Sequence, residues 1–408
     1  MEMYVIIGAS LAGAKAAETL REEGFDGRIV LIGEEGERPY ERPPLSKGYL
    51  IGPAERAVAY VHDEQWYADQ GIDLRLAVRA TMLDPVSRAL TLDGGEQLRY
   101  DKLLLATGSR VRMLDVPGAD LRGVRYLRTF DESESLRDAL VPEARVVVVG
   151  AGWIGMETAA AARTRGAEVT VVEVDSLPLR RVLGDEVARI YADLHAEHGV
   201  GFRFGSIVAE ITGSAHASGV RLSDGELLPA DVVVVGVGVR PAVELAEAAS
   251  LDVDNGVVTD ERLRTSDPAI YACGDAANSY HPMIGKRIRV EHWANALNGG
   301  KAAARSMLGQ EVAYDRVPYF FSDQYDLGME YAGYVEPDGY EQVVFRGDPV
   351  AREFIAFWLA DGRVLAGMNA NVWDVTESIQ RLVRAGYAGK TVDPRRLADT
   401  SVALEDLA

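Results

Sequence analysis

The chain has 408 residues, of which 48% are hydrophobic and 26% are charged, and its formal net charge is −20. This length predicts two or three domains, and the acidic balance argues against nucleic acid as a partner, because phosphate backbones need a basic surface. No apolar run approaches the ~20 residues that span a bilayer, and the N-terminus lacks the basic start of a signal peptide, so we expect a cytoplasmic protein with no membrane partner.

The chain opens with a strand–turn–helix–strand pattern. A β-branched run over 4–7 leads through the turn Gly8–Gly13 into an Ala-rich helix over 14–23, and a strand over 28–32 follows. Glycines in such a turn allow a tight bend and let a pyrophosphate approach the N–H groups at the helix start. The turn has Ser10 where the G-x-G-x-x-G pattern has its middle glycine, and it still predicts a dinucleotide site.

The same pattern returns later in the chain. A run over 146–149 leads through the turn Gly150–Gly155 into a helix over 156–165 and a strand over 168–172. This copy matches G-x-G-x-x-G at every glycine. The two segments together predict a parallel βαβ unit in duplicate, with one dinucleotide site in each copy.

An acidic residue is expected at the end of the strand after each turn, where it binds a ribose diol. Glu173 holds this place in the second copy, 23 residues after the first glycine of its turn, and Glu34 or Glu35 holds it in the first. A carboxylate repels a 2′-phosphate, so Glu173 favours NADH over NADPH. Arg180 and Arg181 follow closely enough to bind such a phosphate, so NADPH stays open.

Further short apolar runs end in glycine, a pattern typical of buried parallel strands. They cover 102–106, 231–235 and 269–272, and a helix is expected over 294–308.

Beyond residue 318 the pattern changes. Apolar runs over 343–345, 351–359 and 364–369 predict antiparallel strands with a turn at Asp361-Gly362, and a helix is expected over 374–385. We interpret this part as a separate C-terminal α+β domain.

Cysteine and histidine usage argues against a metal site or a thiol site. The single cysteine, Cys273, allows no intramolecular disulfide and no zinc or iron–sulfur site, which would take several thiolates. We interpret it as a small packed residue beside Gly274. His195 and His198 stand in no carboxylate-rich pattern, and we expect exposed helix residues and no metal.

Seven motifs in order carry a family resemblance that covers essentially the whole chain. The sequence resembles the FAD-dependent pyridine-nucleotide reductases, and within them the group of putidaredoxin, rubredoxin and dioxygenase-ferredoxin reductases. The motifs are Gly8–Gly13, Pro39–Lys47, Leu105–Gly108, Gly150–Gly155, Gly236–Pro241, Tyr271–Asp275 and Phe321–Tyr325.

The resemblance implies a glutathione-reductase-like α/β fold with two Rossmann-like domains and the C-terminal α+β domain. The first glycine turn then binds FAD and the second binds NADH. The FAD-binding domain covers 1–110 and 242–317, interrupted by an NAD-binding domain over 111–241, and the C-terminal domain covers 318–408.

The resemblance also implies the residues of each site. Lys47 lies near flavin N5, where a cation stabilises the reduced ring, and pairs with Glu157; these two are the predicted catalytic residues. Asp275 accepts hydrogen bonds from the ribityl hydroxyls. The FAD-binding set is Gly8, Ser10, Leu11, Ala12, Gly13, Glu34, Arg42, Pro44, Lys47, Ala106, Thr107, Gly108, Gly274, Asp275, Glu291 and Trp293. The NAD-binding set is Gly150, Gly152, Ile154, Gly155, Glu157, Glu173, Arg181 and Gly238.

Several aromatic residues have two interpretations. Trp293 either covers the flavin, as in some family members, or packs in the core. Phe321 stands where the family commonly has a Trp that is associated with partner docking or electron transfer. Trp358 and Trp373 either serve nearby or fill the C-terminal core.

The resemblance and the cysteine count together predict the activity. No cysteine occurs between Met1 and Ala272, so the redox thiols of lipoamide and glutathione reductases, of NADH peroxidases and of coenzyme A disulfide reductases are absent. We predict an NADH-dependent ferredoxin reductase, in which hydride passes to FAD and single electrons pass to a two-iron two-sulfur ferredoxin that serves a cytochrome P450 or a Rieske oxygenase. Two alternatives stay open: another thiol-free flavoprotein resembling monodehydroascorbate or quinone reductases, and a redox sensor resembling apoptosis-inducing factor.

An acidic ferredoxin needs a local basic surface on this acidic chain. Lys286–Arg289 with Lys301 and Arg305 is the candidate for a transient complex, and the same residues fit a solvated charge run. We expect a monomer or a weak homodimer.

Overall fold

The computed structural model describes residues 1–407, which group by their contacts into two compact units. Unit 1 comprises 1–41, 56–110 and 240–318, and unit 2 comprises 42–55, 111–239 and the chain from 319 onward. Both are mixed α/β structures with parallel sheets, so the predicted fold class is confirmed. Residues 42–55, which lie inside the predicted first domain, pack in unit 2.

Unit 1 is built on a parallel sheet with the strand order β19-β7-β1-β2-β3. The middle strand is buried on both faces, with Tyr4 and Ile6 on one side and Val5 and Ile7 on the other. A strand buried on both sides appears in the sequence as a continuous apolar run, which is why it was recognisable. The strands are β1 (Met3–Ile7), β2 (Arg28–Ile32), β3 (Ile72–Arg75), β7 (Lys102–Leu105) and β19 (Ile270–Ala272).

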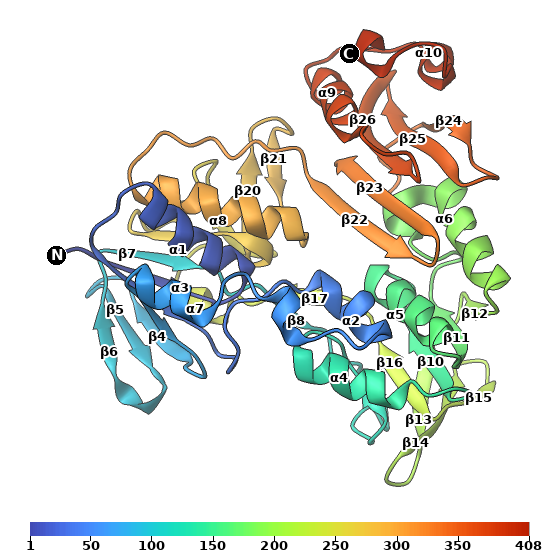
Figure 1. The fold of residues 1–408 in the computed structure, drawn as a ribbon, viewed down its shortest axis with the longest axis horizontal. Helices are drawn as coiled ribbons and strands as arrows, with labels where there is room; N and C mark the ends of the chain where they lie inside the picture. Colours follow the sequence, from blue (N-terminus) through green and yellow to red (C-terminus); the bar gives the residue numbers. More distant parts are fainter. Residues whose placement is uncertain (408) are drawn as a thin grey trace. The chain divides into compact units, whose positions relative to one another are not determined.

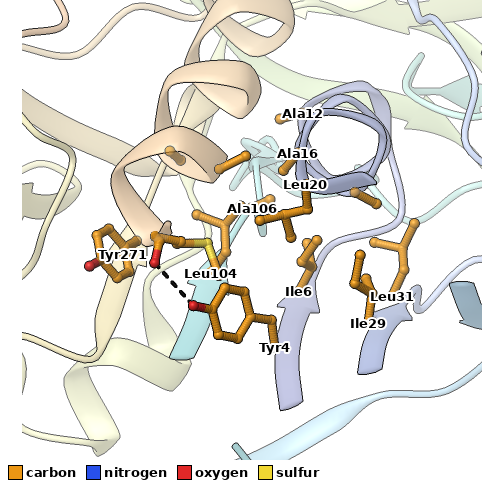
Figure 2. Close-up of a cluster of buried hydrophobic side chains, with 14 of the residues drawn as sticks. Tyr4, Ile6, Ala12, Ala16, Leu20, Ile29, Leu31, Leu104, Ala106 and Tyr271 are labelled. Carbon is orange, nitrogen blue, oxygen red and sulfur yellow. Dashed lines mark hydrogen bonds between the residues drawn. The ribbon is translucent and has the colours of Figure 1, made fainter. Parts of the chain in front are cut away.

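One face of this sheet packs against α1 (Leu11–Glu22) and α8 (Trp293–Met307). Figure 2 shows Leu20 of α1 in the apolar cluster beside the side chains of the sheet. At the edge of the cluster the hydroxyl of Tyr4 donates a hydrogen bond to the carbonyl oxygen of Met307 at 3.2 Å. The sheet and both helices therefore share one apolar core.

The opposite face of the sheet packs against a three-stranded antiparallel sheet, through side chains such as Leu83 and Leu90. A second small sheet has the order β18-β20-β21. The remaining elements of unit 1 are η2 (Arg56–Ala59), α3 (Glu64–Asp69), β4 (Ala80–Asp84), β5 (Ala89–Leu92), η3 (Asp93–Gly95), β6 (Gln97–Arg99), α7 (Glu244–Ala248), β18 (Val257–Thr259), η4 (Gly274–Ala276), β20 (Ala277–His281) and β21 (Lys286–Ile288).

Unit 2 contains a second parallel sheet, with the order β12-β11-β10-β16-β9. An antiparallel sheet covers one of its faces, where Val147 and Val233 meet Ile211 and Val220. The parallel strands are β9 (Val124–Arg125), β10 (Arg145–Val149), β11 (Glu168–Glu173), β12 (Gly201–Phe204) and β16 (Val232–Val235), and the antiparallel ones are β13 (Val208–Gly213), β14 (Ala217–Leu222) and β15 (Leu227–Pro229).

Several helices of unit 2 lie near this second sheet (Figure 1), and the one over 153–164 contacts β10 and β11 directly. They are η1 (Pro43–Ser46), α2 (Gly48–Ile51), α4 (Phe130–Ala139), α5 (Trp153–Thr164) and α6 (Arg180–Glu197). Where the chain passes from one unit to the other, β8 (Ser109–Val111) and β17 (Val239–Pro241) pair as a two-stranded sheet.

The C-terminal part of unit 2 is an antiparallel sheet with the order β22-β23-β26-β25-β24. The turn expected at Asp361-Gly362 joins β25 to β26, with φ of 50° and 71° at its two residues, as a two-residue hairpin turn requires. The elements are β22 (Tyr319–Gln324), β23 (Leu327–Gly333), β24 (Gln342–Asp348), β25 (Glu353–Ala360), β26 (Arg363–Ala370), α9 (Thr376–Tyr387), α10 (Pro394–Ala398) and η5 (Leu404–Leu407).

Three expectations need correction. The helices after the glycine turns begin inside those turns, at Leu11 and Trp153. The sequence did not indicate β22 and β23 as strands, because serine, aspartate and glycine interrupt their apolar patterns, and pairing within the sheet decides strand formation there. His195, expected to be exposed, is buried, whereas His198 is exposed.

Of the two C-terminal tryptophans, Trp358 is fully buried and donates its indole N–H to the carbonyl oxygen of Leu183 at 3.2 Å. It therefore fills the core of unit 2. Trp373 is 54% exposed.

Candidate functional site

The first glycine turn links β1 to α1 in unit 1, and close packing requires its outer glycines. Gly8 has φ +118°, and a Cβ atom on it would lie 2.0 Å from the carbonyl oxygen of Ala106 at the end of β7. A Cβ atom on Gly13 would lie 2.0 Å from the carbonyl oxygen of Gly8. The turn and residues 106–108 therefore meet at the carboxyl ends of neighbouring strands, where ligands bind in such sheets.

Asp275 joins the same edge from the end of β19. It accepts a hydrogen bond from the Ser109 hydroxyl at 2.7 Å, and the neighbouring Gly274 has φ +68°. A Cβ atom on Gly274 would lie 3.5 Å from Cβ of Ala12, so this turn packs against the start of α1. Unit 1 thus gathers Gly8–Gly13, residues 106–108 and Gly274-Asp275 at one edge of its sheet.

The start of α1 is suited to a pyrophosphate. Ser10 is the N-cap residue, but its side chain makes no capping hydrogen bond, and the first turn contains no acidic residue. The first N–H groups of the helix therefore have no side-chain acceptor, and the positive end of the helix dipole is available to a negatively charged ligand. Leu11 and Ala12, from the predicted FAD-binding set, are buried in this first turn.

The second glycine turn links β10 to α5 in unit 2. A Cβ atom on Gly150, which has φ +97°, would lie 2.5 Å from the carbonyl oxygen of Gly236, and one on Gly155 would lie 2.0 Å from the carbonyl oxygen of Gly150. Gly152 differs: a Cβ atom there would meet nothing within 4 Å, and its φ of −76° suits any residue. Packing does not require glycine at this position, and its absence of a side chain leaves room for a group such as a pyrophosphate at the uncapped start of α5.

Glu173, at the end of β11, faces this second turn. One of its carboxylate oxygens accepts a hydrogen bond from the N–H of Ala151 at 2.5 Å, and the other accepts one from the N–H of Asp175 at 3.0 Å. Arg181 forms an ion pair with Asp175 at 2.7 Å and is mostly exposed. Of the other predicted NAD-binding residues, Ile154 is exposed on α5, and Gly238 accepts a backbone hydrogen bond from Arg112 at 2.9 Å.

Lys47 and Glu157 form an ion pair inside unit 2. The Lys47 Nζ atom lies 2.8 Å from Glu157 Oε2, and Glu157 is only 4% exposed on α5. Two hydroxyl groups donate to the same carboxylate: Ser46 to Oε2, and Ser322 to Oε1 at 2.7 Å. A buried carboxylate keeps its charge only with such partners, so the four side chains form one polar cluster.

Sequence reasoning missed Ser46 and Ser322. Both lie in motifs that were recognised, beside Lys47 and beside Phe321, but a serine alone carries no specific signal. The ring centroid of Phe321 lies 5.6 Å from Lys47 Nζ, within the range of a cation–π contact. The residue that replaces the commoner Trp therefore contacts the predicted catalytic lysine.

The remaining predicted FAD-binding residues have varied surroundings. Arg42 donates to the carbonyl oxygen of Arg128 at 2.5 Å, Pro44 lies in η1, and Glu34 forms an ion pair with Arg110 at 3.1 Å. Glu291 forms an ion pair with Arg289 and is exposed, and Trp293 is the first residue of α8.

Cys273 is 1% exposed in unit 1, and burial raises the pKa of its thiol to about 12. Its interpretation as a packed residue is confirmed, because a thiol with that pKa stays protonated near neutral pH and is a poor nucleophile. Among residues 1–407, no three His, Cys, Asp or Glu side chains are grouped to hold a metal ion. No helix in the same part of the chain is long and apolar enough to cross a membrane.

Comparison with known proteins covers the whole chain. Residues 2–300 match the family model "Pyridine nucleotide-disulphide oxidoreductase", and residues 319–408 match "Reductase C-terminal". The chain is 40% identical to the anthranilate 1,2-dioxygenase system ferredoxin–NAD(+) reductase component of Burkholderia cepacia, over 98% of each chain.

Two solved structures are similar over nearly their full lengths. The ferredoxin reductase for the CYP199A2 system from Rhodopseudomonas palustris has a TM-score of 0.95 at 39% identity, with 100% of this chain and 99% of that chain covered. The covalent putidaredoxin reductase–putidaredoxin complex has a TM-score of 0.93 at 35% identity, with 99% and 97% covered. These matches confirm the resemblance identified from the motifs.

Proposed function

The chain belongs to the pyridine nucleotide-disulphide oxidoreductase family, and we propose that it works as an NADH-dependent ferredoxin reductase. Family membership implies FAD and NAD(H) as cofactors. The proposed acceptor is a two-iron two-sulfur ferredoxin that serves a cytochrome P450 or a Rieske oxygenase. The proposed location is the cytoplasm, and the proposed state is a monomer or a weak homodimer.

The observation that carries this proposal is the inert thiol. The family is named for disulphide chemistry, yet Cys273, the single cysteine of this chain, is buried and its thiol has a raised pKa. Electrons therefore have no thiol relay to follow within the chain and must leave directly for an external acceptor. Relatives similar over their whole length are named ferredoxin reductases, which supports a ferredoxin as that acceptor.

We assign the FAD-holding role to the edge of the unit 1 sheet. The uncapped start of α1 binds the pyrophosphate, Asp275 accepts hydrogen bonds from the ribityl hydroxyls, and Glu34 lies at the ribose end of β2. The other residues proposed for FAD binding are Arg42 and Pro44, which belong to unit 2, and Glu291 and Trp293, which belong to unit 1. The domain limits proposed for this part are 1–110 and 242–317, with 111–241 for NAD and 318–408 for the C-terminal domain.

In the NAD-binding part, the start of α5 binds the pyrophosphate and Glu173 binds the adenosine ribose diol, while Ile154, Arg181 and Gly238 line the rest. Glu157 holds the ammonium group of Lys47, and Lys47 supplies the positive charge that favours a reduced flavin. Bound FAD supplies the conversion of a two-electron hydride donor into single-electron transfers. The protein orients the bound cofactors and supplies fixed charges, both of which are in place before electron transfer begins.

The proposal is tested by steady-state NADH oxidation with cytochrome c as the final acceptor, with and without added two-iron ferredoxin. We expect turnover that depends strongly on the ferredoxin, and direct ferricyanide reduction as the control for a working flavin. Equal turnover on free ascorbyl radical or a quinone would contradict the ferredoxin assignment. Negligible turnover with a long-lived charge-transfer complex would indicate a redox sensor.

A further inference from the structure

We propose that Ser322, Gln324 and His195 form a buried hydrogen-bond chain that positions the Glu157 carboxylate, and through it Lys47. All of these residues lie in unit 2, on β22, α6, α5 and the segment before α2. The inference rests on the proposed function only for the role of Lys47, which is to favour a reduced flavin. The hydrogen-bond chain itself is a geometric feature, and it can be tested without any electron acceptor.

The chain runs through three successive contacts. His195 Nε2 lies 2.8 Å from Gln324 Oε1, Gln324 Nε2 lies 3.1 Å from Ser322 Oγ, and Ser322 Oγ lies 2.7 Å from Glu157 Oε1. Every residue in this hydrogen-bond chain, including Glu157, is at most 4% exposed. Water therefore does not compete for these contacts, and each polar group depends on its neighbour in the chain.

The protons in this chain have a single consistent direction. Ser322 has one hydroxyl proton, and its close contact with the acceptor-only Glu157 carboxylate uses it. The Ser322 oxygen must then accept from the Gln324 amide nitrogen, which leaves the amide oxygen to accept from His195 Nε2. Each donor thus points toward Glu157, and a flipped Gln324 amide would give the single Ser322 proton two acceptors, so that one of the two contacts would lack a proton.

The imidazole of His195 supports the same direction. Its Nδ1 atom is buried and makes no hydrogen bond to any described residue, so the proton of the neutral ring belongs on Nε2. Burial lowers the pKa of His195 to about 4, which keeps the ring neutral near pH 7. Two titratable groups face the ring: His198, on the same helix, and Tyr325, which packs against both histidine rings.

The chain explains why β22 matters to the ion pair on α5. The Oε2 atom of Glu157 is held by Lys47 and Ser46, whereas Oε1 has Ser322. Without the Ser322 donor, Oε1 loses its hydrogen bond and only Lys47 and Ser46 hold the carboxylate, through Oε2, so the partner of Lys47 is less firmly fixed. Ser322, Gln324 and His195 are therefore positioning residues and touch no reacting atom themselves.

The first test is nitrogen-15 NMR of histidine-labelled holoenzyme in the oxidised state. We expect the signal of His195, assigned by its absence in His195→Gln, to show a neutral ring with its proton on Nε2 at pH 7. A proton on Nδ1, or a charged ring, would overturn the proposal. The tautomer is read on the wild-type protein, and His195→Gln serves only to assign the signal, so this result does not depend on the functional effect of any substitution.

The second test measures how fast an amine-acylating reagent modifies Lys47, read by mass spectrometry on the oxidised holoenzyme. Ser322→Ala and His195→Leu should raise this rate several-fold, and His195→Gln, which keeps an N–H donor, should restore it to near the original rate. Ser378→Ala is the matched control, because Ser378 is another buried serine of unit 2 that donates to a glutamate, Glu405, at 2.9 Å. It should leave Lys47 labelling unchanged.

An unchanged labelling rate in Ser322→Ala, or an equal rise in Ser378→Ala, would overturn the positioning role. We also expect the two-electron midpoint potential of FAD in Ser322→Ala to become more negative, because a mobile Lys47 stabilises the reduced ring less. These readouts are independent of the acceptor. If wild-type enzyme failed to reduce a ferredoxin while the labelling pattern held, the proposed function would fail and the hydrogen-bond chain would stand.

Discussion

Glu157 shows how a single buried residue depends on partners distant in the sequence. Its carboxylate is almost fully buried, and losing one partner of such a group leaves an uncompensated charge. The resemblance led us to expect the pairing with Lys47, and the structure shows it at 2.8 Å. The hydroxyls of Ser46 and Ser322 come from positions 111 and 165 residues away, a separation that no local pattern records.

Glu173 is the residue that should decide between NADH and NADPH. Replacing it with Ala should raise the NADPH/NADH ratio of kcat/KM by about tenfold or more, because repulsion of the 2′-phosphate and the bond to the ribose diol are both lost. The measurement is steady-state kinetics with each nucleotide and ferricyanide as acceptor.

Glu173→Gln separates these two causes. The amide oxygen keeps an acceptor for the N–H of Ala151, which Glu173 now engages at 2.5 Å, but it carries no charge. We expect NADPH use to improve while NADH use falls less than in the Ala variant. If neither substitution changed the ratio, the assignment of nucleotide preference to this residue would be wrong.

The two helix starts illustrate what one element contributes. Both α1 and α5 begin without a side-chain cap and without an acidic residue in the first turn. In each turn the outer glycines satisfy backbone packing, so the sequence pattern reports partly on the fold and partly on the ligand. Gly152 is the position where packing places no demand.

Gly152→Ala should therefore weaken NADH binding without weakening the fold. The added methyl group meets open space in the protein, so we expect the melting temperature to stay within a few degrees, while Kd for NADH rises about tenfold, equivalent to about 1.4 kcal/mol. Calorimetric titration and thermal unfolding provide the two readouts.

Gly155→Ala serves as the contrasting control on the same helix. Its methyl group would lie 2.0 Å from the carbonyl oxygen of Gly150, so thermal stability should fall. A Gly152→Ala protein that lost stability but bound NADH normally would show that this glycine serves the fold.

At the scale of the whole molecule, the fully buried His195 and the half-buried His292 make stability depend on pH. His195 and His292 both have their pKa lowered to about 4 by burial, against an ordinary value of 6.5. The unfolded chain takes up these protons first as the pH falls. The stability that comes from the neutral rings is present above pH 6.5 and is lost progressively toward pH 4.

We expect the free energy of unfolding to fall by up to about 3 kcal/mol per histidine between pH 6.5 and 4. His195→Gln should reduce the dependence of the free energy of unfolding on pH by the contribution of one proton. The contribution of His292 should remain. Urea unfolding at a series of pH values measures this pH dependence in the wild-type protein and in His195→Gln. The same pH dependence in both proteins would contradict the neutral, buried state of His195.

Partner docking is also a property of the whole surface. In the basic segment, Arg289 and Arg305 form ion pairs with Glu291 and Glu23, which reduces the local positive charge. Lys286 and Arg287 are both exposed on β21 and are the better candidates for contact with an acidic ferredoxin.

Charge reversal of Lys286 and Arg287 together to Glu should raise KM for the ferredoxin about tenfold and leave ferricyanide reduction intact. The effect should shrink as salt is added. Reversal of the exposed pair Arg395 and Arg396 on α10 is the matched control. Parallel loss of both activities in the first variant, or an equal effect of the control, would rule out this docking site.

Much of the architecture was determined by the sequence itself. Strands buried on both faces, such as β1 and β10, appear as unbroken apolar runs, and glycine turns with a helix behind them have one physical explanation in such a sheet. These local patterns are sufficient because each requirement lies within about 30 consecutive residues. The buried strands and the two turns follow from them, whereas the family follows from the resemblance of the ordered motifs and the absence of redox thiols from the cysteine count.

Only the tertiary structure decided what lies around the functional carboxylate. β22 becomes a strand by pairing with β23, and β23 also pairs with β26; this pairing places Ser322 and Gln324 beside α5 and α6. His195 appeared to be an exposed helix residue because the strand that covers it is more than 100 residues away, and burial against a distant strand is invisible to helical periodicity. The sequence thus identified the ion pair through its resemblance, and the fold supplied the residues that hold it in place.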